Sequence, residues 1–145
     1  MNMPEQFPAK LGQVLVVDDN PISTESMRQA LQLNFEVDSV DSGEACLERL
    51  AAESRLPDLI LLDIEMGGID GFETCRRLRE NFGMPVIFVT SHDDLPECIK
   101  AFDSGGDDFV VKPFDPEVLL RKAQRIVQHQ ASKNSLTAEK ESLSS

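Results

Sequence analysis

The sequence has no tryptophan, no tyrosine, few basic residues and only three cysteines. Cys46, Cys75 and Cys98 are odd in number and far apart, which excludes a C-x-x-C metal pair and a complete disulfide framework. We interpret them as buried thiols of a cytosolic protein. Only 14 Lys and Arg oppose 26 Asp and Glu, and the net charge is -12. Because such a surface repels nucleic acid phosphates and anionic lipids, we expect neither nucleic acid nor a membrane as a partner.

Long apolar runs are also missing. The longest aliphatic run, Leu59 to Leu62, is far too short to cross a bilayer, and the N-terminal MNMPEQFPAK lacks the apolar core of a signal peptide. We therefore predict a cytoplasmic protein. The chain has 145 residues, of which 41% are apolar, and this is enough for one domain that folds without disulfides or metals.

Apolar runs of strand length alternate with segments of helical period. Residues 14–17, 59–62 and 86–89 are continuous runs, typical of strands buried on both faces of a parallel sheet, and residues 35–40 and 109–111 are weaker strand candidates. The segments with helical period are 21–33, 42–53, 71–81, 94–103 and 115–130. Right-handed crossovers through these helices predict an α/β fold with an open, doubly wound parallel sheet.

Two helix starts carry recognisable signals. Asp41–Glu44 has the D-x-x-E form of a capping box, and Pro116 follows Asp115 where a first helical turn accepts proline. We therefore expect a helix to begin at each of these places.

Composition divides the chain into three parts. Residues 1–11 form an N-terminal extension, residues 12–129 the folded domain, and residues 130–145 a flexible tail or the start of a linker to an output domain. Few residues from His129 onward are apolar, which favours a frayed or disordered tail. Leu136 and Leu143 lie seven residues apart, so a coiled-coil heptad is the alternative.

Chemically complementary side chains follow the predicted strands. The residues at the strand ends are Asp18, Asp19, Asp63, Thr90, Ser91 and Lys112. Ligands of open α/β sheets bind at this edge. Two carboxylates about 5 Å apart repel by roughly 3 kcal/mol at an effective dielectric near 20, so three of them raise a pKa or bind a cation. Magnesium prefers carboxylate oxygens and shares its shell with phosphate, whereas no histidine or cysteine cluster favours zinc.

Each of these residues also has an ordinary structural explanation. An aspartate after a strand is most often a helix cap or a turn residue, and Asp18-Asp19-Asn20-Pro21 fits that explanation. The combination of complementary groups at four strand ends argues for a site instead. The sequence has no G-x-x-x-x-G-K-[ST], and no G-x-G-x-x-G follows the first strand, so the acidic first turn favours a metal over a pyrophosphate.

From about Gln13 to about Gln128 the sequence resembles the receiver domain of two-component response regulators. The matching motifs are V-L-V-V-D-D, L-I-L-L-D-I-E-M-G-G-I-D-G, P-V-I-F-V-T-S and G-G-D-D-F-V-V-K-P-F. The resemblance implies a flavodoxin-like (βα)5 fold with strand order 2-1-3-4-5. It also implies a phosphorylation-dependent signalling switch, which is no enzyme beyond catalysing its own phosphorylation and dephosphorylation.

The resemblance implies a role for each matching site residue. Asp63 is the phosphoacceptor and takes a phosphoryl group from a histidine kinase or a phosphotransfer protein. Asp19 is a direct magnesium ligand, Asp18 is an acidic neighbour that acts largely through water, and Glu65 adds its backbone carbonyl to the metal shell. Lys112 holds phosphoryl oxygens.

Further roles concern the response to phosphorylation. The Thr90 hydroxyl also holds phosphoryl oxygens, and Thr90 and Phe109 together form the switch, because Phe109 rotates into space that Thr90 vacates. Glu65 and His92 set the lifetime of the acyl phosphate. The bond between Lys112 and its following proline is commonly cis in the family.

The resemblance also indicates partners. The fourth helix, the fifth strand and the fifth helix form the output face, through which a homodimer is expected. One departure from the family is Gly67, where a proline is frequent, so Gly67-Gly68 predicts a more mobile loop. Two alternatives stay open: a magnesium-dependent phosphohydrolase with an aspartyl nucleophile, which usually has aspartate where Glu65 stands, and a scaffold without phosphorylation.

Overall fold

The computed structural model describes residues 9–52, 54–91 and 94–144, with side chains described up to Lys133. The strands are β1 (Gln13–Val17), β2 (Glu36–Val40), β3 (Leu59–Leu62), β4 (Val86–Thr90) and β5 (Asp108–Val111). The helices are α1 (Pro21–Leu31), α2 (Gly43–Ala52), α3 (Gly71–Arg79), α4 (Leu95–Asp103) and α5 (Pro116–Ser144).

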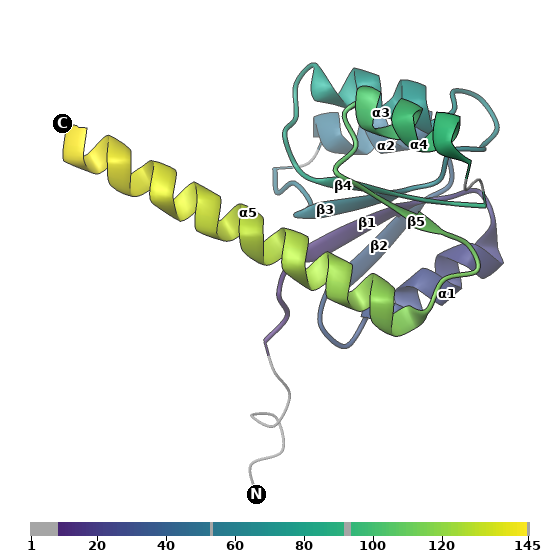
Figure 1. The fold of residues 1–145 in the computed structure, drawn as a ribbon, viewed down its shortest axis with the longest axis horizontal. Coiled ribbons are helices and arrows are strands. Elements are labelled where there is room, and N and C mark those ends of the chain that lie inside the picture. The colour runs from purple at the N-terminus through teal and green to yellow at the C-terminus, as the bar shows by residue number, and fades with distance from the viewer. Residues whose placement is uncertain (1–8, 53, 92–93, 145) are drawn as a thin grey trace, which may run out of the picture.

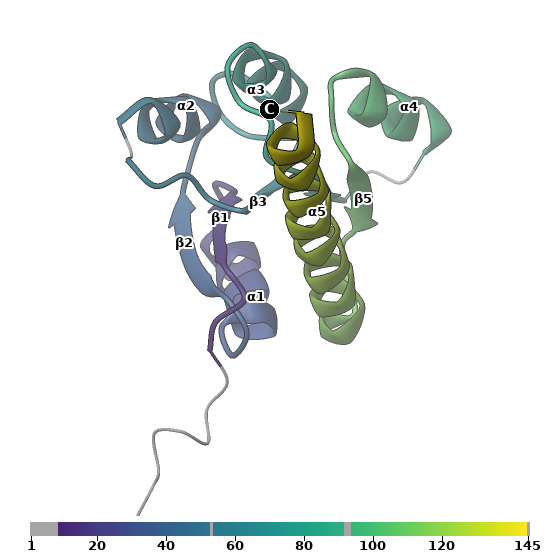
Figure 2. The ribbon, with the colours of Figure 1, turned by 90° about the vertical axis from the view of Figure 1, so that its left-hand side faces the viewer.

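The five strands form one parallel sheet in the order β2-β1-β3-β4-β5. Helices α2, α3 and α4 cover one face of the sheet, and α1 and α5 cover the other (Figures 1 and 2). This confirms the predicted doubly wound, flavodoxin-like α/β fold.

Each central strand contributes to two cores, one on each face of the sheet. In β1, Leu15 and Val17 pack on the side of α2, α3 and α4, whereas Val14 and Val16 pack on the side of α1 and α5. Side chains alternate between the two faces of a strand, and both faces are covered here. This explains why the central strands are continuous apolar runs.

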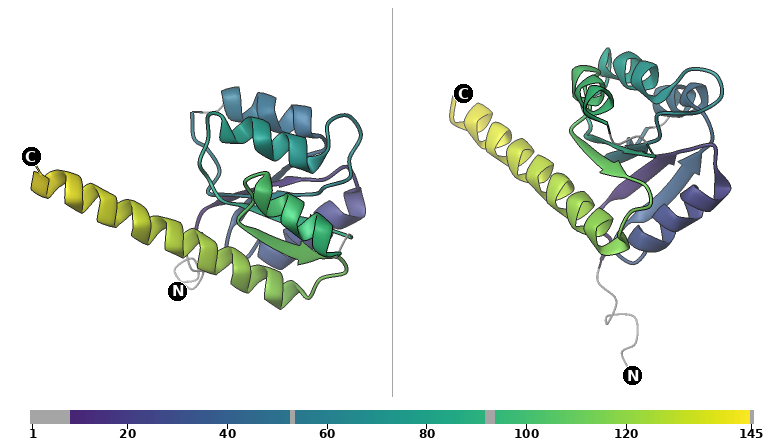
Figure 3. Two further views of the ribbon diagram at one scale, coloured as in Figure 1. Left: turned by 45° about the horizontal axis from the view of Figure 1, so that its top comes forward. Right: turned by 45° about the vertical axis from the view of Figure 1, so that its right-hand side comes forward.

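Helix α5 is longer than the sequence predicted. The expectation was an end at Gln130 followed by a frayed or disordered tail, but the backbone is helical to Ser144. Residues 131–144 contain neither proline nor glycine, so nothing in them breaks a helix. This part of α5 projects past the sheet (Figures 1 and 3). The side chains of Leu136 and Leu143 lie outside the described part of the chain, and the assignment of 130–145 to a linker stays a prediction.

The two predicted helix starts had different outcomes. Asp115 accepts a hydrogen bond from the Glu117 N–H at 2.8 Å, and α5 begins at Pro116 as expected. The predicted capping box was wrong, because the Ser42 hydroxyl, one residue later than Asp41, accepts the Ala45 N–H at 3.0 Å.

None of the helices in the described ranges combines the length and apolar character of a membrane span.

Candidate functional site

The predicted site residues gather at the carboxyl edge of the sheet. Asp18 and Asp19 follow β1, Asp63 follows β3, Thr90 ends β4, and Lys112 follows β5. One carboxylate oxygen from each of the three aspartates lies within 4.8 Å of the others. The parallel arrangement therefore brings together groups that are up to 94 positions apart in the chain.

The Lys112 amine lies between the carboxylates of Asp18 and Asp63. Its Nζ donates a hydrogen bond to Asp18 Oδ2 at 2.8 Å and lies 3.8 Å from Asp63 Oδ1. The Asp18 side chain is fully buried, so this ion pair offsets the cost of removing its charge from water. Asp18 Oδ1 accepts the Asn20 N–H at 2.9 Å. The bond between Lys112 and Pro113 is cis, as the resemblance implied.

The surroundings of Asp63 disfavour the charge on its carboxylate. It is 8% exposed, and its Oδ1 accepts the Ile64 N–H at 2.9 Å. Burial, followed by the charge of Asp18, raises the pKa of Asp63 to about 6, against the weaker opposing effect of Lys112. Ionising Asp63 therefore costs more free energy than ionising an ordinary aspartate, and a positive charge beside it would lower that cost.

The donor set fits a hard divalent cation. The cluster consists of carboxylates only, and the exposed Asp19 places it at the protein surface. A hollow of about 500 Å³ borders Asp18 and Asp19 and is also lined by Glu25 and Asp41. Oxygen ligands with an open side suit magnesium, which keeps several waters and binds phosphate.

The remaining predicted residues differ in their surroundings. The Thr90 side chain is 1% exposed at the end of β4, and Phe109 in β5 is half-buried and packs against the core below α2, α3 and α4. Glu65 is exposed in the loop between β3 and α3. His92 lies outside the described residues. The structure therefore places Thr90 at the same edge as the carboxylates and Phe109 within the neighbouring strand.

Sequence reasoning missed two residues that shape the site. A Cβ on Gly71 would lie 2.2 Å from the Asp63 carbonyl oxygen, so only glycine lets α3 begin this close to the end of β3. Asn20 is the N-cap of α1, and its side chain accepts the Ile22 and Ser23 N–H groups. The ordinary explanation of the D-D-N-P segment as a helix cap thus applies to Asn20, and neither aspartate is the N-cap of α1.

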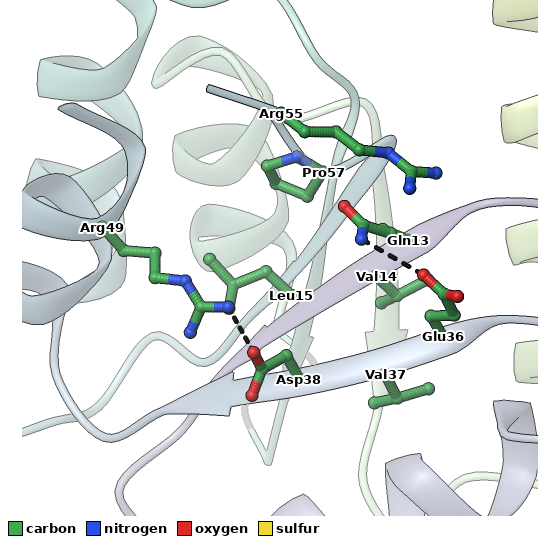
Figure 4. Close-up of a pocket in the computed structure, with 9 residues that line it drawn as sticks. All are labelled: Gln13, Val14, Leu15, Glu36, Val37, Asp38, Arg49, Arg55 and Pro57. Carbon is green, nitrogen blue, oxygen red and sulfur yellow. Dashed lines mark hydrogen bonds and ion pairs between the residues drawn. The ribbon is translucent and has the colours of Figure 1, made fainter. Parts of the chain in front are cut away.

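A second cavity lies beside β2, the edge strand of the sheet (Figure 4). Its volume is about 270 Å³, and β1, β2, α2 and the segment that follows α2 line it. Four of its polar side chains form two pairs, since Arg49 binds Asp38 and Gln13 donates to Glu36 at 3.1 Å. None of the predicted site residues lines this cavity.

Fold and site together define a doubly wound α/β domain with three clustered carboxylates beside a lysine amine. The chain belongs to the response regulator receiver domain family, which residues 14–124 match. Among curated relatives, the response regulator ArlR of Staphylococcus saprophyticus is 36% identical over 122 residues, which are 83% of this chain and 54% of that protein. The transcriptional regulatory protein ResD of Bacillus subtilis is 40% identical over 111 residues, 74% of this chain and 45% of that protein. This chain spans about half the length of these relatives.

Solved structures agree with this assignment. The BeF3-activated receiver domain of DrrB from Thermotoga maritima matches with a TM-score of 0.74 and 30% identity, over 81% of this chain and 97% of that one. A CheY-like receiver domain protein from Methanospirillum hungatei matches with a TM-score of 0.76 and 26% identity, over 87% and 99%. The fold of this chain is therefore that of known receiver domains.

Proposed function

We propose that this chain is a phosphorylation-dependent switch that accepts a phosphoryl group on Asp63 from a histidine kinase or a phosphotransfer protein. One observation carries the proposal. Three carboxylates have oxygens within 4.8 Å of one another, and the amine of Lys112 lies beside two of them. In this proposal Asp18, Asp19, Asp63 and the Glu65 backbone carbonyl hold magnesium. A cytoplasmic location stays a prediction.

The chemistry is an in-line transfer between two nucleophiles. An Asp63 oxygen attacks the phosphorus of a phosphohistidine, the O–P bond of an acyl phosphate forms, and the N–P bond to the histidine breaks. When bound, magnesium supplies positive charge that offsets the charge on the phosphoryl oxygens. Lys112, whose Nζ is 3.8 Å from Asp63 Oδ1, is placed to bind one of these oxygens. The chain acts on itself and needs no separate substrate pocket.

The response to phosphorylation is proposed to begin at Thr90. New phosphoryl oxygens accept a hydrogen bond from its hydroxyl and draw it toward Asp63. Phe109 then turns into the vacated space, which its half-buried position supports. The face formed by α4, β5 and α5 is the proposed surface for a homodimer, and the exposed apolar side chains of Leu95, Ile99 and Phe102 on α4 support it.

Two residues are proposed to set the lifetime of the acyl phosphate. Glu65→Ala or His92→Ala should change the rate at which water removes the phosphoryl group without preventing its formation. Decay of the phosphorylated protein, followed by intact mass, measures this rate. Unchanged lifetimes in both variants would refute the assignment.

The decisive experiment is phosphorylation by acetyl phosphate, with and without magnesium, followed by intact mass and gel filtration. We expect the mass of one phosphoryl group on the wild type only with magnesium, none on Asp63→Asn, and a shift toward a dimer on gel filtration. Modification that persists in Asp63→Asn contradicts the proposed acceptor. The family assignment does not favour the phosphohydrolase alternative, and turnover of an aryl phosphate that depends on Asp63 would reverse this judgement.

A further inference from the structure

The loop that follows Asp63 lies against the start of α2. The Ile69 N–H donates a hydrogen bond to Glu44 Oε2 at 3.1 Å. Gly68 has a φ of 79°, and a Cβ built on it would lie 2.4 Å from the same oxygen. The backbone of this loop, residues 65–70, is therefore in direct contact with the carboxylate of Glu44.

Packing holds Glu44 in place relative to the loop and α3. A Cβ on Gly43, the first residue of α2, would lie 2.0 Å from Thr74 Oγ1 and 2.8 Å from Ile69 Cγ1. The Thr74 hydroxyl donates to the Asp70 carbonyl at 2.8 Å. The start of α2 thus contacts both the loop and the first turn of α3. This packing fixes the backbone that carries the Glu44 side chain.

The far end of the loop is tied to the phosphoacceptor strand. The Gly71 N–H donates to the Ile64 carbonyl at 2.8 Å, and Gly71 packs directly on the Asp63 carbonyl. Between these contacts, a Cβ on Gly67 would meet no atom within 4 Å. On its α2 side the loop is therefore held by two contacts, the Glu44 carboxylate at Gly68 and Ile69 and the packing of Ile69 on Gly43.

The charge on Glu44 supports this contact. Hydrogen bonds from its own N–H and from the Ile69 N–H lower the pKa of the Glu44 carboxyl. The group is therefore an ionised acceptor at neutral pH, and hydrogen bonds to ionised groups are the stronger kind.

We propose that Glu44 is a positioning residue for the phosphoacceptor site. It holds the loop that carries Glu65, and so it sets both the affinity for magnesium, through the Glu65 backbone carbonyl, and the lifetime of the acyl phosphate. This inference rests on the proposed function. It also opposes the mobility that the sequence predicted for Gly67-Gly68.

The test compares four variants. Glu44→Ala removes the acceptor, and Glu44→Gln keeps an oxygen that accepts the Ile69 N–H. Gly68→Ala forces a Cβ against the carboxylate, and Glu48→Ala is the matched control, an exposed glutamate one turn further along α2. The readouts are amide hydrogen exchange at Ile69 in chelator, magnesium affinity by calorimetry, and decay of the acyl phosphate by intact mass.

Glu44→Ala and Gly68→Ala should speed exchange at Ile69 by about tenfold, the effect of losing one hydrogen bond to an ionised acceptor. Both should weaken magnesium binding about twofold to fivefold and change the acyl phosphate lifetime in the same direction. Glu44→Gln should recover most of each effect, and Glu48→Ala should match the wild type.

Several outcomes would overturn the inference. Exchange at Ile69 that is the same in Glu44→Ala and Glu48→Ala shows that the contact does not restrain the loop. Faster exchange with unchanged magnesium affinity shows that the contact is structural only. Failure of the wild type to accept a phosphoryl group overturns the proposed function instead, and magnesium affinity together with exchange then still decides the role of Glu44.

Discussion

Without magnesium, Asp63→Asn should stabilise the fold at neutral pH. Burial and the charge of Asp18 raise the pKa of Asp63 from its ordinary value of 3.8 to about 6. A rise of this size corresponds to about 3 kcal/mol of destabilisation when the group is ionised. We expect the variant to recover about 1 to 3 kcal/mol of unfolding free energy at pH 7, because the asparagine amide carries no charge.

The pH dependence follows from the protons that each state binds. Between pH 3.8 and about 6, the folded chain keeps the proton of Asp63 more often than the unfolded chain does. The free energy of unfolding of the wild type therefore falls as the pH rises through this window. The stability difference between Asp63→Asn and the wild type should be smallest near pH 4, grow toward pH 6, and stay constant above it.

The assay is urea unfolding followed by far-UV circular dichroism, since the chain has no tryptophan or tyrosine for fluorescence. It is run in chelator from pH 4 to 8, with Asp103→Asn, an exposed carboxylate of α4, as control. Added magnesium should reduce the gain, because it binds the folded wild type more tightly than the variant. A stability difference that does not vary with pH, or a variant that is less stable at pH 7, would refute the reasoning.

Three further changes test the site and its supports. Lys112→Ala leaves the buried Asp18 without its amine partner and should cost about 3 kcal/mol in urea unfolding of the metal-free protein. Gly71→Ala places a Cβ against a backbone carbonyl and should cost about 1 to 3 kcal/mol by the same measurement, whereas Gly67→Ala, which meets no atom, should cost far less. Asn20→Ala removes the cap of α1 and should cost about 1 kcal/mol in thermal unfolding; an unchanged melting temperature would contradict the cap.

The sheet could be predicted closely because its strands are buried on both faces. The run 14–17 differs from β1 by one residue, and 86–89 differs from β4 by one. The weaker candidate 35–40 began one residue early, since Phe35 is buried but lies before β2. An apolar pattern indicates burial, whereas a strand boundary depends on hydrogen bonds that the pattern does not encode. The end of α5 was missed for a related reason, because low apolar content does not by itself end a helix.

The site could be predicted only in part. Strand ends of a parallel sheet share an edge, so the gathering of Asp18, Asp63 and Lys112 followed from the strand assignment. The pairing of Lys112 with Asp18 and the need for glycine at position 71 did not. Both depend on how side chains and helices pack across segments far apart in the sequence. The only local sign of the second was the glycine of the I-D-G motif, and the first had none.

Burial is the main cause of the raised pKa of Asp63, and the arrangement of charges around it adds to the effect. The amine of Lys112 binds Asp18 at 2.8 Å, so that carboxylate is compensated, while Asp63 at 3.8 Å receives a weaker attraction and repulsion from its neighbours. The uncompensated charge is therefore located on the proposed nucleophile. A bound cation would offset this charge, whereas a neutral side chain at position 63 removes it permanently. A variant that stabilises the metal-free fold at this position should therefore lose the switch, which is the expected conflict between stability and function at a reactive site.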